Sequence, residues 1–364
     1  MQILIDHLAT TLHTAAERKT PLQIHGGGSK AFYGNPVAGE NVDVLDVATY
    51  SGIIDYDPTE LVVTARAGTR LADLEAKLNQ QGQMLAFEPP HFAAAATLGG
   101  CVATGLSGPR RASAGAVRDF VLGVRLLDGM GSDLHFGGQV MKNVAGYDVS
   151  RLQVGAMGTL GILLEVSLKV LPQPQSERTV RMQMNETEAI QRVNQWAGKP
   201  LPISASCFCE GELTVRLSGA ESAVHAAHAK LGGEELAEGK SFWESVREQT
   251  HAFFQSGKTL WRLSIKSTTP PVSLPGQQLI EWNGALRWLV SDEGVDAETI
   301  RTVASNAAGH ATLFRSGESR AEVFHPLAPG MMKIHRLLKQ KFDPVGILNH
   351  GRLYPEHLNA NQSR

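Results

Sequence analysis

The stretch "TLGGCVATGLSGPRRASAGAVRDFVLG", residues 97–123, carries small side chains through a long loop-like region and ends in an apolar run. Gly99 and Gly100 are adjacent, and Gly105, Gly108 and Gly115 follow at short intervals. Such loops expose backbone N–H groups and short hydroxyls, which can replace water around a pyrophosphate without side-chain charge. Large side chains would keep that ligand out. The stretch therefore predicts a surface where the backbone approaches a phosphate-bearing ligand.

Two more glycine-rich segments flank this one. Residues 21–34, "PLQIHGGGSKAFYG", hold three consecutive glycines. Residues 142–171, "KNVAGYDVSRLQVGAMGTLGILLEVSLKVL", place Gly146, Gly155, Gly158 and Gly161 before a strand-like run. Adjacent glycines lose much chain entropy on ordering, so a fold tolerates them mainly where φ is positive or backbones approach closely. Three such segments favour one long ligand over three unrelated turns.

Neither of two common phosphate motifs is present at residues 21–34. The nucleoside-triphosphate loop requires Gly, four residues and then Gly-Lys-Ser/Thr, whereas here Ser29 precedes Lys30. The dinucleotide fingerprint requires a third spaced glycine, which does not follow Gly28. Taken alone, the triple glycine is as compatible with a plain turn as with an anion cradle.

The composition limits the possible partners. The 364 residues are 42% hydrophobic and carry a net charge of -2, so nothing attracts nucleic acid or an anionic membrane globally. Three cysteines are too few for a disulfide framework, a zinc site or an iron–sulfur cluster, and they fit a reducing cytoplasm. The first 19 residues read as an amphipathic helix rather than a secretion signal, and charges interrupt the apolar run at 154–171. We expect a cytoplasmic protein with no nucleic-acid partner, no metal and no direct membrane insertion.

The first part of the chain has an α+β pattern. Residues 42–48 and 61–68 are strand-like, and 69–82 have helical spacing with Thr69 as the cap. Residues 119–137 read as a hairpin that turns at Asp128-Gly129. The proline-containing "LPQPQSE" at 171–177 marks a crossing into a second unit.

The second unit shows two approximate copies of a strand–helix–strand pattern, which suggests a duplicated split-βαβ, ferredoxin-like sheet. A C-terminal helix then ends at Asp343-Pro344. We expect three parts: residues 1–172, a cap at 173–325, and a segment at 326–364 that returns to the first part. The expected elements of the cap are strands at 178–184, 203–209, 212–217, 259–265, 277–282, 285–290 and 310–314, and helices at 187–197, 220–231 and 296–307, with a polar helical passage near 241–255.

The order of four motifs resembles flavoproteins of the vanillyl-alcohol oxidase / p-cresol methylhydroxylase (PCMH) fold. These motifs are HGGGS (25–29), the stretch at 97–123, KNVAGYDVSRLQVGAMGTLGIL (142–163) and LNHGRLYP (348–355). Within that group the chain is most similar to the smaller of the FAD-binding subunits of bacterial glycolate oxidases. The resemblance covers essentially the whole chain. It implies a two-subdomain PCMH-type FAD-binding domain plus the α+β cap.

The resemblance also implies which residues hold FAD. It assigns the pyrophosphate to Gly26, Gly27, Gly28, Ser29, Thr97, Gly99, Gly100, Thr104 and Gly105. It assigns the ribityl and adenosine side to Ser107, Ser113, Gly115 and Val117, and the adenine to Gly161 and Ile162. The isoalloxazine is assigned to the C-terminal loop with Asn349 and Arg352. Ser29 stands where relatives with covalent flavin have histidine, so the implied FAD is non-covalent. His25 replaces the arginine that most relatives carry, and a neutral imidazole would weaken the attraction for the diphosphate.

No catalytic residue is identifiable. Oxidation of a 2-hydroxy acid needs a group that holds the carboxylate, usually arginine, and a base or a metal that handles the hydroxyl proton. The His-x-Gly-Asp-Gly-Asn signature that the larger relatives carry near the end of the cap is absent, and His325, His335 and His350 are weak candidates. Lys142 and Tyr147 are interpreted as buttresses of the glycine turn, Arg110 and Arg111 as a solvated pair rather than phosphate ligands, and Cys207 and Cys209 as buried packing.

The resemblance favours one of three hypotheses. The preferred one is an FAD-binding subunit of a multi-subunit glycolate oxidase, joined to a larger flavoprotein subunit and an iron–sulfur subunit, with any membrane attachment made through those partners. The second is a self-sufficient FAD-dependent 2-hydroxy-acid dehydrogenase. The third is a scaffold with a vestigial flavin site.

Overall fold

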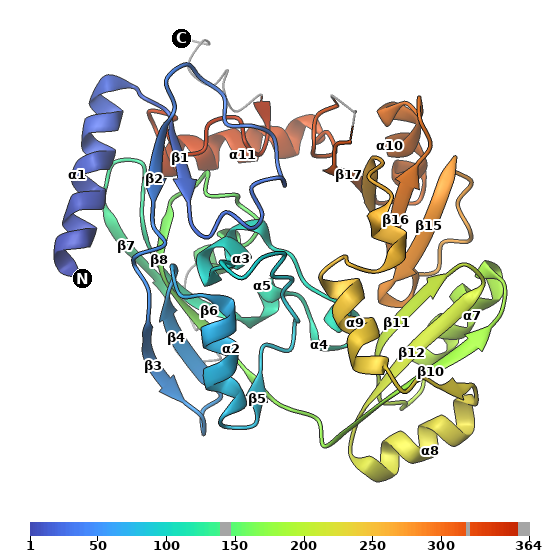
Figure 1. The fold of residues 1–364 in the computed structure, drawn as a ribbon. Helices are drawn as coiled ribbons and strands as arrows, with labels where there is room; N and C mark the ends of the chain where they lie inside the picture. Colours follow the sequence, from blue (N-terminus) through green and yellow to red (C-terminus); the bar gives the residue numbers. More distant parts are fainter. Residues whose placement is uncertain (139–146, 318–320, 356–364) are drawn as a thin grey trace.

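The computed structural model describes residues 1–138, 147–317 and 321–355, which form two α+β units side by side (Figure 1). Lys142 and Gly146 lie outside the described residues. The N-terminal unit, blue to green in Figure 1, contains one sheet and its helices, and the yellow to orange unit contains a second, larger sheet. Helix α11 (Pro329–Phe342) and the loop after it return to the N-terminal unit.

The N-terminal unit is built on an antiparallel five-stranded sheet in the order β3-β4-β8-β6-β7. Its central strand β8 is apolar on both faces, because α2 and α3 pack on one face and α1 packs on the other. The sheet strands are β3 (Ile53–Asp57), β4 (Val62–Arg66), β6 (Val121–Leu127), β7 (Asp133–Gly137) and β8 (Ile162–Lys169), and the main helices are α1 (Gln2–Arg18), α2 (Leu71–Asn79) and α3 (Leu98–Thr104).

Short elements complete this unit. A parallel pair, β1 (Leu22–His25) and β2 (Asp43–Asp46), lies beside α1, and β1 ends directly at the triple glycine. Leu348 forms a bridge to Leu22, so the C-terminal segment extends this pair. The remaining short elements are β5 (Gln83–Met84), β9 (Leu171–Pro172), α4 (Arg111–Ala114), α5 (Val117–Phe120) and α6 (Val149–Leu152).

The second unit is one eight-stranded sheet in the order β13-β10-β12-β11-β15-β16-β14-β17. Its first four strands and its last four strands each have the split-βαβ order, and the antiparallel pair β11–β15 joins the two halves. The strands are β10 (Ser176–Gln183), β11 (Ile203–Cys209), β12 (Glu212–Gly219), β13 (Glu234–Glu235), β14 (Leu260–Ser264), β15 (Gly276–Glu281), β16 (Leu286–Ser291) and β17 (His310–Arg315).

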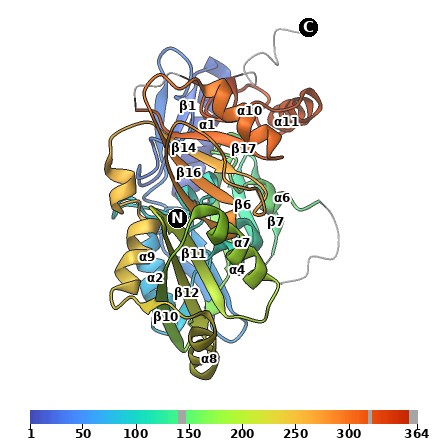
Figure 2. The same cartoon turned by 90° about the vertical axis from the view of Figure 1, so that its right-hand side faces the viewer.

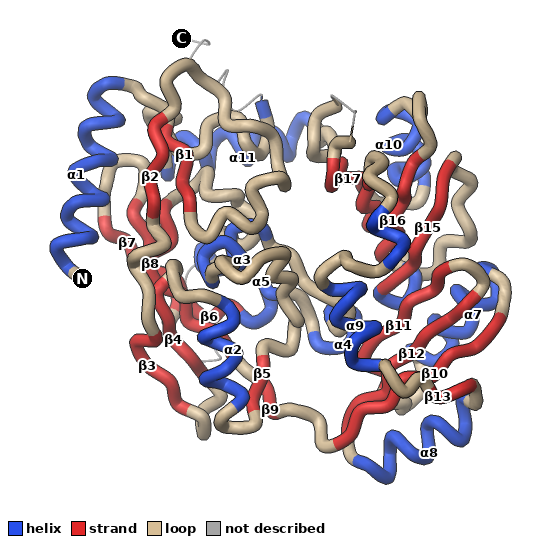
Figure 3. Tube along the Cα trace, viewed as in Figure 1, coloured by secondary structure: helices blue, strands red, loops and turns tan. Residues whose placement is uncertain are grey.

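Helices lie on both faces of this sheet, and more of them lie on the outer face than on the face towards the N-terminal unit (Figures 2 and 3). The outer face packs against α7 (Glu186–Ala197), α8 (Glu221–Leu231) and α10 (Ala297–Asn306) through two apolar clusters. The inner face meets α9 (Gly239–Arg247), the short helical turns η1 (Ala252–Gln255) and η2 (Trp282–Gly284), and apolar residues of the N-terminal unit. A single apolar cluster thereby crosses from one unit to the other.

The α+β class and the duplicated ferredoxin-like sheet are confirmed, whereas one local expectation is wrong. Arg70, not Thr69, precedes the first turn of α2, and the Thr69 hydroxyl instead accepts a hydrogen bond from the Gly52 amide at 2.9 Å. The domain boundary at 172/173 stays our proposal. Among the described residues, no helix combines the length and the apolar character that a membrane crossing requires.

Candidate functional site

A pocket with an empty volume of about 950 Å³ opens where the three glycine-rich segments and the C-terminal loop converge. The strand β1 delivers the triple glycine to it, α3 delivers its first turn, and the turn before β8 delivers a third wall. Eleven of the residues that the resemblance assigned to FAD line this pocket: Gly26, Gly27, Gly28, Ser29, Thr97, Gly99, Gly100, Thr104, Gly161, Asn349 and Arg352. The sequence segments thus meet at one place.

The other six assigned residues lie outside the pocket lining and stay predictions. The Ser107 hydroxyl accepts a hydrogen bond from the Val117 amide, and the Ser113 hydroxyl donates to the Ser204 carbonyl on β11. Gly105 ends α3 in a left-handed conformation. Gly115 ends α4, and the fully buried Ile162 begins β8 and packs in the apolar cluster beside α1.

Glycine is required at the triple-glycine turn chiefly because two loops approach each other there. A Cβ atom on Gly27 would lie 1.5 Å from the Ala95 carbonyl oxygen, and Gly28 has a φ of +66°. Gly100 is different, since a Cβ there would meet only the Thr97 hydroxyl, at 3.2 Å. The glycines of the turn therefore let the cradle close, and Gly100 keeps its interior open.

The donors of the pocket fit an anionic ligand. Within the described chain, the backbone N–H groups of residues 26–30 have no intramolecular hydrogen-bond partner. The buried amide Nε2 of Gln153, which also lines the pocket, has none either. The described lining contains His25, Lys30 and Arg352 but no acidic side chain. Because unpaired buried donors are costly, this arrangement suits a diphosphate that accepts hydrogen bonds.

Lys30 and Gln153 are pocket residues that sequence reasoning missed. Lys30 is 6% exposed, and its ammonium donates to the Ser29 hydroxyl at 3.4 Å and the His91 carbonyl at 3.3 Å. Burial lowers the pKa of Lys30, because the charged form loses its hydration. The position of Lys30 shortly after the triple glycine could have identified it as a pocket residue from the sequence. Gln153 gave none, because it lies one residue beyond a four-residue helix.

The C-terminal loop holds the pocket wall in place. The Asn349 side chain accepts from the Ile24 amide at 2.8 Å and donates to the Met157 carbonyl at 2.6 Å. The Arg352 guanidinium donates to the carbonyl oxygens of Ala31 and Tyr33 at 3.0 and 2.8 Å. Burial lowers the pKa of Arg352. Asn349 therefore joins the C-terminal loop to the strand before the triple glycine and to the turn before β8, and Arg352 joins it to the chain after the triple glycine.

The weak histidine candidates gain no support from the pocket. His325, His335 and His350 do not line it, and burial lowers the pKa of each imidazole. His325 instead contacts the Ser305 hydroxyl at 3.2 Å and accepts from the Ala311 amide at 3.3 Å. Among the residues that the structure describes, no cluster of three His, Cys, Asp or Glu side chains is arranged to hold a metal ion. Tyr147 is 98% exposed, Cys207 is buried and Cys209 is half-buried.

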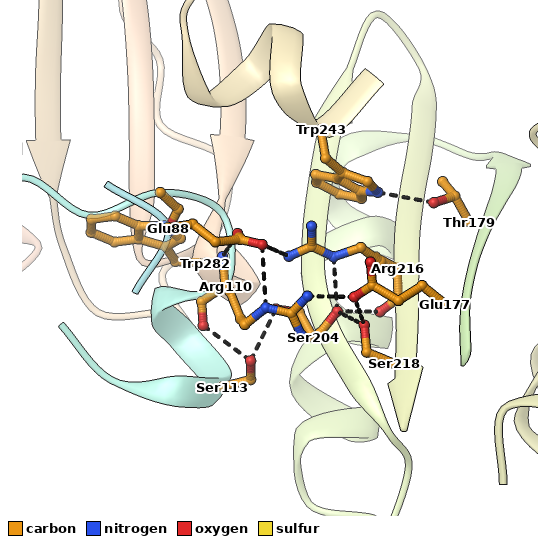
Figure 4. Close-up of polar contacts among 11 residues, drawn as sticks. Glu88, Arg110, Ser113, Glu177, Thr179, Ser204, Arg216, Ser218, Trp243 and Trp282 are labelled. Atoms are coloured by element: carbon orange, nitrogen blue, oxygen red, sulfur yellow. Dashed lines mark hydrogen bonds and ion pairs between the residues drawn. The ribbon is translucent and has the colours of Figure 1, made fainter. Parts of the chain in front are cut away.

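The interpretation of Arg110 and Arg111 as a solvated pair is wrong. Arg110 is 7% exposed and forms ion pairs with Glu88, at 3.2 Å, and with Glu177 of the cap (Figure 4). Arg111 stacks on the Trp282 ring, with 4.4 Å between the guanidinium carbon and the ring centroid. Their sequence neighbourhood is polar, but the cap covers both side chains, and sequence alone could not show that contact.

Comparison with known proteins agrees with this geometry. Residues 5–137 match the family model described as the FAD binding domain. The fold resembles the solved structure of an alkyldihydroxyacetonephosphate synthase, with a TM-score of 0.65 and 17% identity over 94% of this chain and 73% of that one. This likeness confirms the expected PCMH-type fold and carries no further functional conclusion.

Two curated relatives refine the placement. The glycolate oxidase subunit GlcD of Bacillus subtilis is 30% identical over 48% of this chain and 37% of its own length. The glycolate oxidase subunit GlcE of Escherichia coli is 50% identical over 96% of this chain and 97% of its own length. Half-identity across nearly both full lengths is the relationship of members of one family, so the chain belongs to the GlcE family of glycolate oxidase subunits.

Proposed function

We propose that this chain is the FAD-binding subunit of a multi-subunit glycolate oxidase that oxidises glycolate to glyoxylate. It contributes a second flavin, or structural support, to a larger flavoprotein subunit and an iron–sulfur subunit. The observation that carries the proposal is the pocket in which unpaired amides, three basic side chains and the glycine turn converge, in a chain of the GlcE family. The complex works in the cytoplasm, with any contact to the inner membrane made by partner subunits.

The chain is an FAD-dependent oxidoreductase subunit, and FAD is its cofactor. The flavin, when bound, supplies a two-electron acceptor. In the proposed arrangement, the amides of residues 26–30 and the Gln153 side chain donate to the diphosphate. Arg352 and Asn349 fix the loops that surround it. Ser29 offers no imidazole for a covalent link, so this FAD is bound non-covalently.

Co-purification tests the subunit assignment. The tagged full-length chain, expressed with its neighbouring gene products, is isolated and its flavin and partner chains are counted. We expect one FAD on this chain, a second on a larger partner, and an iron–sulfur protein in the same complex. A chain that elutes alone with its flavin, and that glycolate reduces without oxygen, would instead establish the self-sufficient dehydrogenase. A complex that assembles without flavin on this chain would establish the scaffold.

A further inference from the structure

The inner face of the cap sheet, which faces the N-terminal unit, carries charged residues among apolar ones. Along β14, Leu260 belongs to the inner cluster and Trp261 and Leu263 to the outer one, so Arg262 points inward by the two-residue period of a strand. Along β15, Leu279 is inner and Ile280 is outer, so Glu281 points inward too. Charge on a buried face is costly unless it is paired.

At one end of this face the charges are fully paired, as Figure 4 shows. Arg216 on β12 contacts the Glu88 carboxylate of the N-terminal unit at 2.8 Å, and its Nε donates to the Ser204 hydroxyl at 2.9 Å. Arg110 pairs with Glu88 and with Glu177 of β10. These four charges satisfy one another, so they need no ligand.

At the other end the charges remain unpaired. Within the described chain, the Arg262 guanidinium makes no hydrogen bond or ion pair, and it stacks on the Trp282 ring, 5.1 Å from the centroid. The Glu281 carboxyl is 4% exposed and accepts one hydrogen bond, from the Trp288 indole at 2.8 Å. No ion pair within 4 Å joins Arg262 to Glu281 in the described structure, although both line the same pocket.

This pocket is small and lies next to the glycine-lined one. Its empty volume is about 330 Å³, roughly a third of the 950 Å³ of the glycine-lined pocket. Apolar residues such as Leu286 and Phe314 form much of its wall, and Phe92 stands on the side of the glycine-lined pocket. The Lys30 ammonium of that pocket lies 5.6 Å from the Phe92 ring centroid, so the walls of the two pockets contact each other there.

An unpaired guanidinium in an apolar pocket matches a carboxylate, because its planar fork donates two parallel hydrogen bonds. A carboxyl oxygen on the same wall matches a hydrogen-bond donor such as a hydroxyl. We propose that this pocket binds a small carboxylate that carries a hydroxyl group, with Arg262 pairing with the carboxylate and Glu281 accepting a hydrogen bond from the hydroxyl. This assignment deepens the proposed function and rests on it for the choice of glycolate as the probe.

Calorimetric titration of the flavin-loaded full chain with glycolate, without oxygen and at pH 8, tests the site. We expect saturable binding that is stronger than binding of acetate, which has no hydroxyl. Arg262→Gln should weaken glycolate binding at least tenfold. The matched control Arg111→Gln should leave it unchanged, because Arg111 stacks on the same Trp282 but does not line the pocket. Glu281→Gln should bring the affinity for glycolate closer to the affinity for acetate, because a neutral amide accepts a weaker hydrogen bond than a carboxylate.

Each outcome decides the assignment. Absence of glycolate binding to wild-type chain, or equal weakening by Arg262→Gln and Arg111→Gln, overturns it. If Arg262→Gln fails to fold, Arg262→Lys keeps the charge but loses the planar fork, and unchanged binding by that variant overturns it as well. Flavin content and partner co-purification are measured on the same samples. A chain that keeps its flavin and partners but binds no glycolate refutes this site and leaves the proposed function standing, whereas a chain that lacks them refutes the proposed function.

Discussion

Glu281 links the small pocket to the stability of the cap. Burial raises the pKa of its carboxyl from 4.5 to about 7, while the Trp288 indole and the Arg262 guanidinium lower it and Glu88 raises it further. Cys207 faces it from β11. In the unfolded chain the carboxyl titrates near its ordinary value. The protonated form is therefore favoured by folding, and its contribution is complete below about pH 4.5 and is lost as the pH rises towards 7.

Glu281→Gln should remove this pH dependence, because the amide cannot ionise and its oxygen can still accept from Trp288. A displacement of about 2.5 pKa units corresponds to roughly 3 kcal/mol, so the variant should gain that much relative to wild type between pH 4.5 and pH 8. Urea unfolding at both pH values measures the difference. The exposed Glu293→Gln serves as the control and should show no such gain. If the free energy of unfolding differs between Glu281→Gln and wild type by the same amount at both pH values, the raised pKa of Glu281 is contradicted.

Gly100 is the position where one side chain should block the flavin without disturbing the fold. A Cβ there meets only the Thr97 hydroxyl and has open pocket beyond it. We expect Gly100→Leu to weaken FAD binding at least tenfold, about 1.4 kcal/mol, with an unchanged circular dichroism spectrum. The matched control is Gly330→Leu, where a Cβ on α11 meets nothing within 4 Å and the pocket is remote. Stoichiometric FAD on folded Gly100→Leu would show that the pocket is not the flavin site.

Gly27→Leu should behave differently from Gly100→Leu. Its Cβ would overlap the Ala95 carbonyl oxygen, so the two loops must separate. The double variant Gly27→Leu/Gly100→Leu should therefore lose both flavin and stability.

At the residue scale, the sequence predicted the pocket residues whose role depends on the local backbone, and it missed the residues whose role depends on contacts between distant strands. The glycines and short hydroxyls that line the pocket follow from their own composition. Arg262 and Glu281 did not, because their sequence context is that of ordinary strands, and only pairing between β14, β15 and β16 places them on one face.

At the scale of elements, the segment 88–110, which includes α3, is attached to β12 and β10 by the charge network of Figure 4. Although burial opposes it, the charges of Arg216 and Arg110 hold the pKa of the Glu88 carboxyl below its usual range, so Glu88 stays ionised. Arg216→Met should therefore destabilise the protein by about 3 kcal/mol, because the buried Glu88 carboxylate would lose one of its partners. Arg192→Met breaks a half-exposed pair with Glu188 one turn away and should cost less than about 1 kcal/mol. Chemical denaturation compares them, and equal effects would contradict a buried network.

Some element boundaries were predictable because they depend on the local sequence, although the expected cap of α2 at Thr69 was wrong. The range 203–209 was predicted and observed as β11, and the tail helix ends before Asp343 as expected. The register in which the two halves of the cap sheet pair could not be predicted from the sequence. It depends on the pairing of β11 with β15, in which Cys207 lies opposite Glu281, and these residues are far apart in sequence.

At the scale of the whole molecule, the N-terminal unit and the cap share one apolar cluster. Tyr33, Leu106 and Met157 from the first unit pack with Trp288 and Phe314 from the cap. Separate domains with small polar interfaces move and unfold independently, but a shared apolar core couples them. We therefore expect a ligand of the N-terminal unit to stabilise the cap.

Tryptophan fluorescence can test this coupling, because the chain has five tryptophans, Trp196, Trp243, Trp261, Trp282 and Trp288, and all lie within the proposed cap. FAD binds the N-terminal unit, and at about 100 times its Kd it should stabilise the folded chain by about 2.7 kcal/mol. If the units unfold together, the midpoint of the tryptophan transition in urea rises with FAD by the same amount as the midpoint measured by circular dichroism. Gly100→Leu, which should weaken FAD binding at least tenfold, should reduce both shifts to about 1.4 kcal/mol or less at the same FAD concentration. A tryptophan midpoint that FAD leaves unchanged, while the circular dichroism midpoint moves, would mean that the cap unfolds on its own and that the shared cluster does not couple the two units.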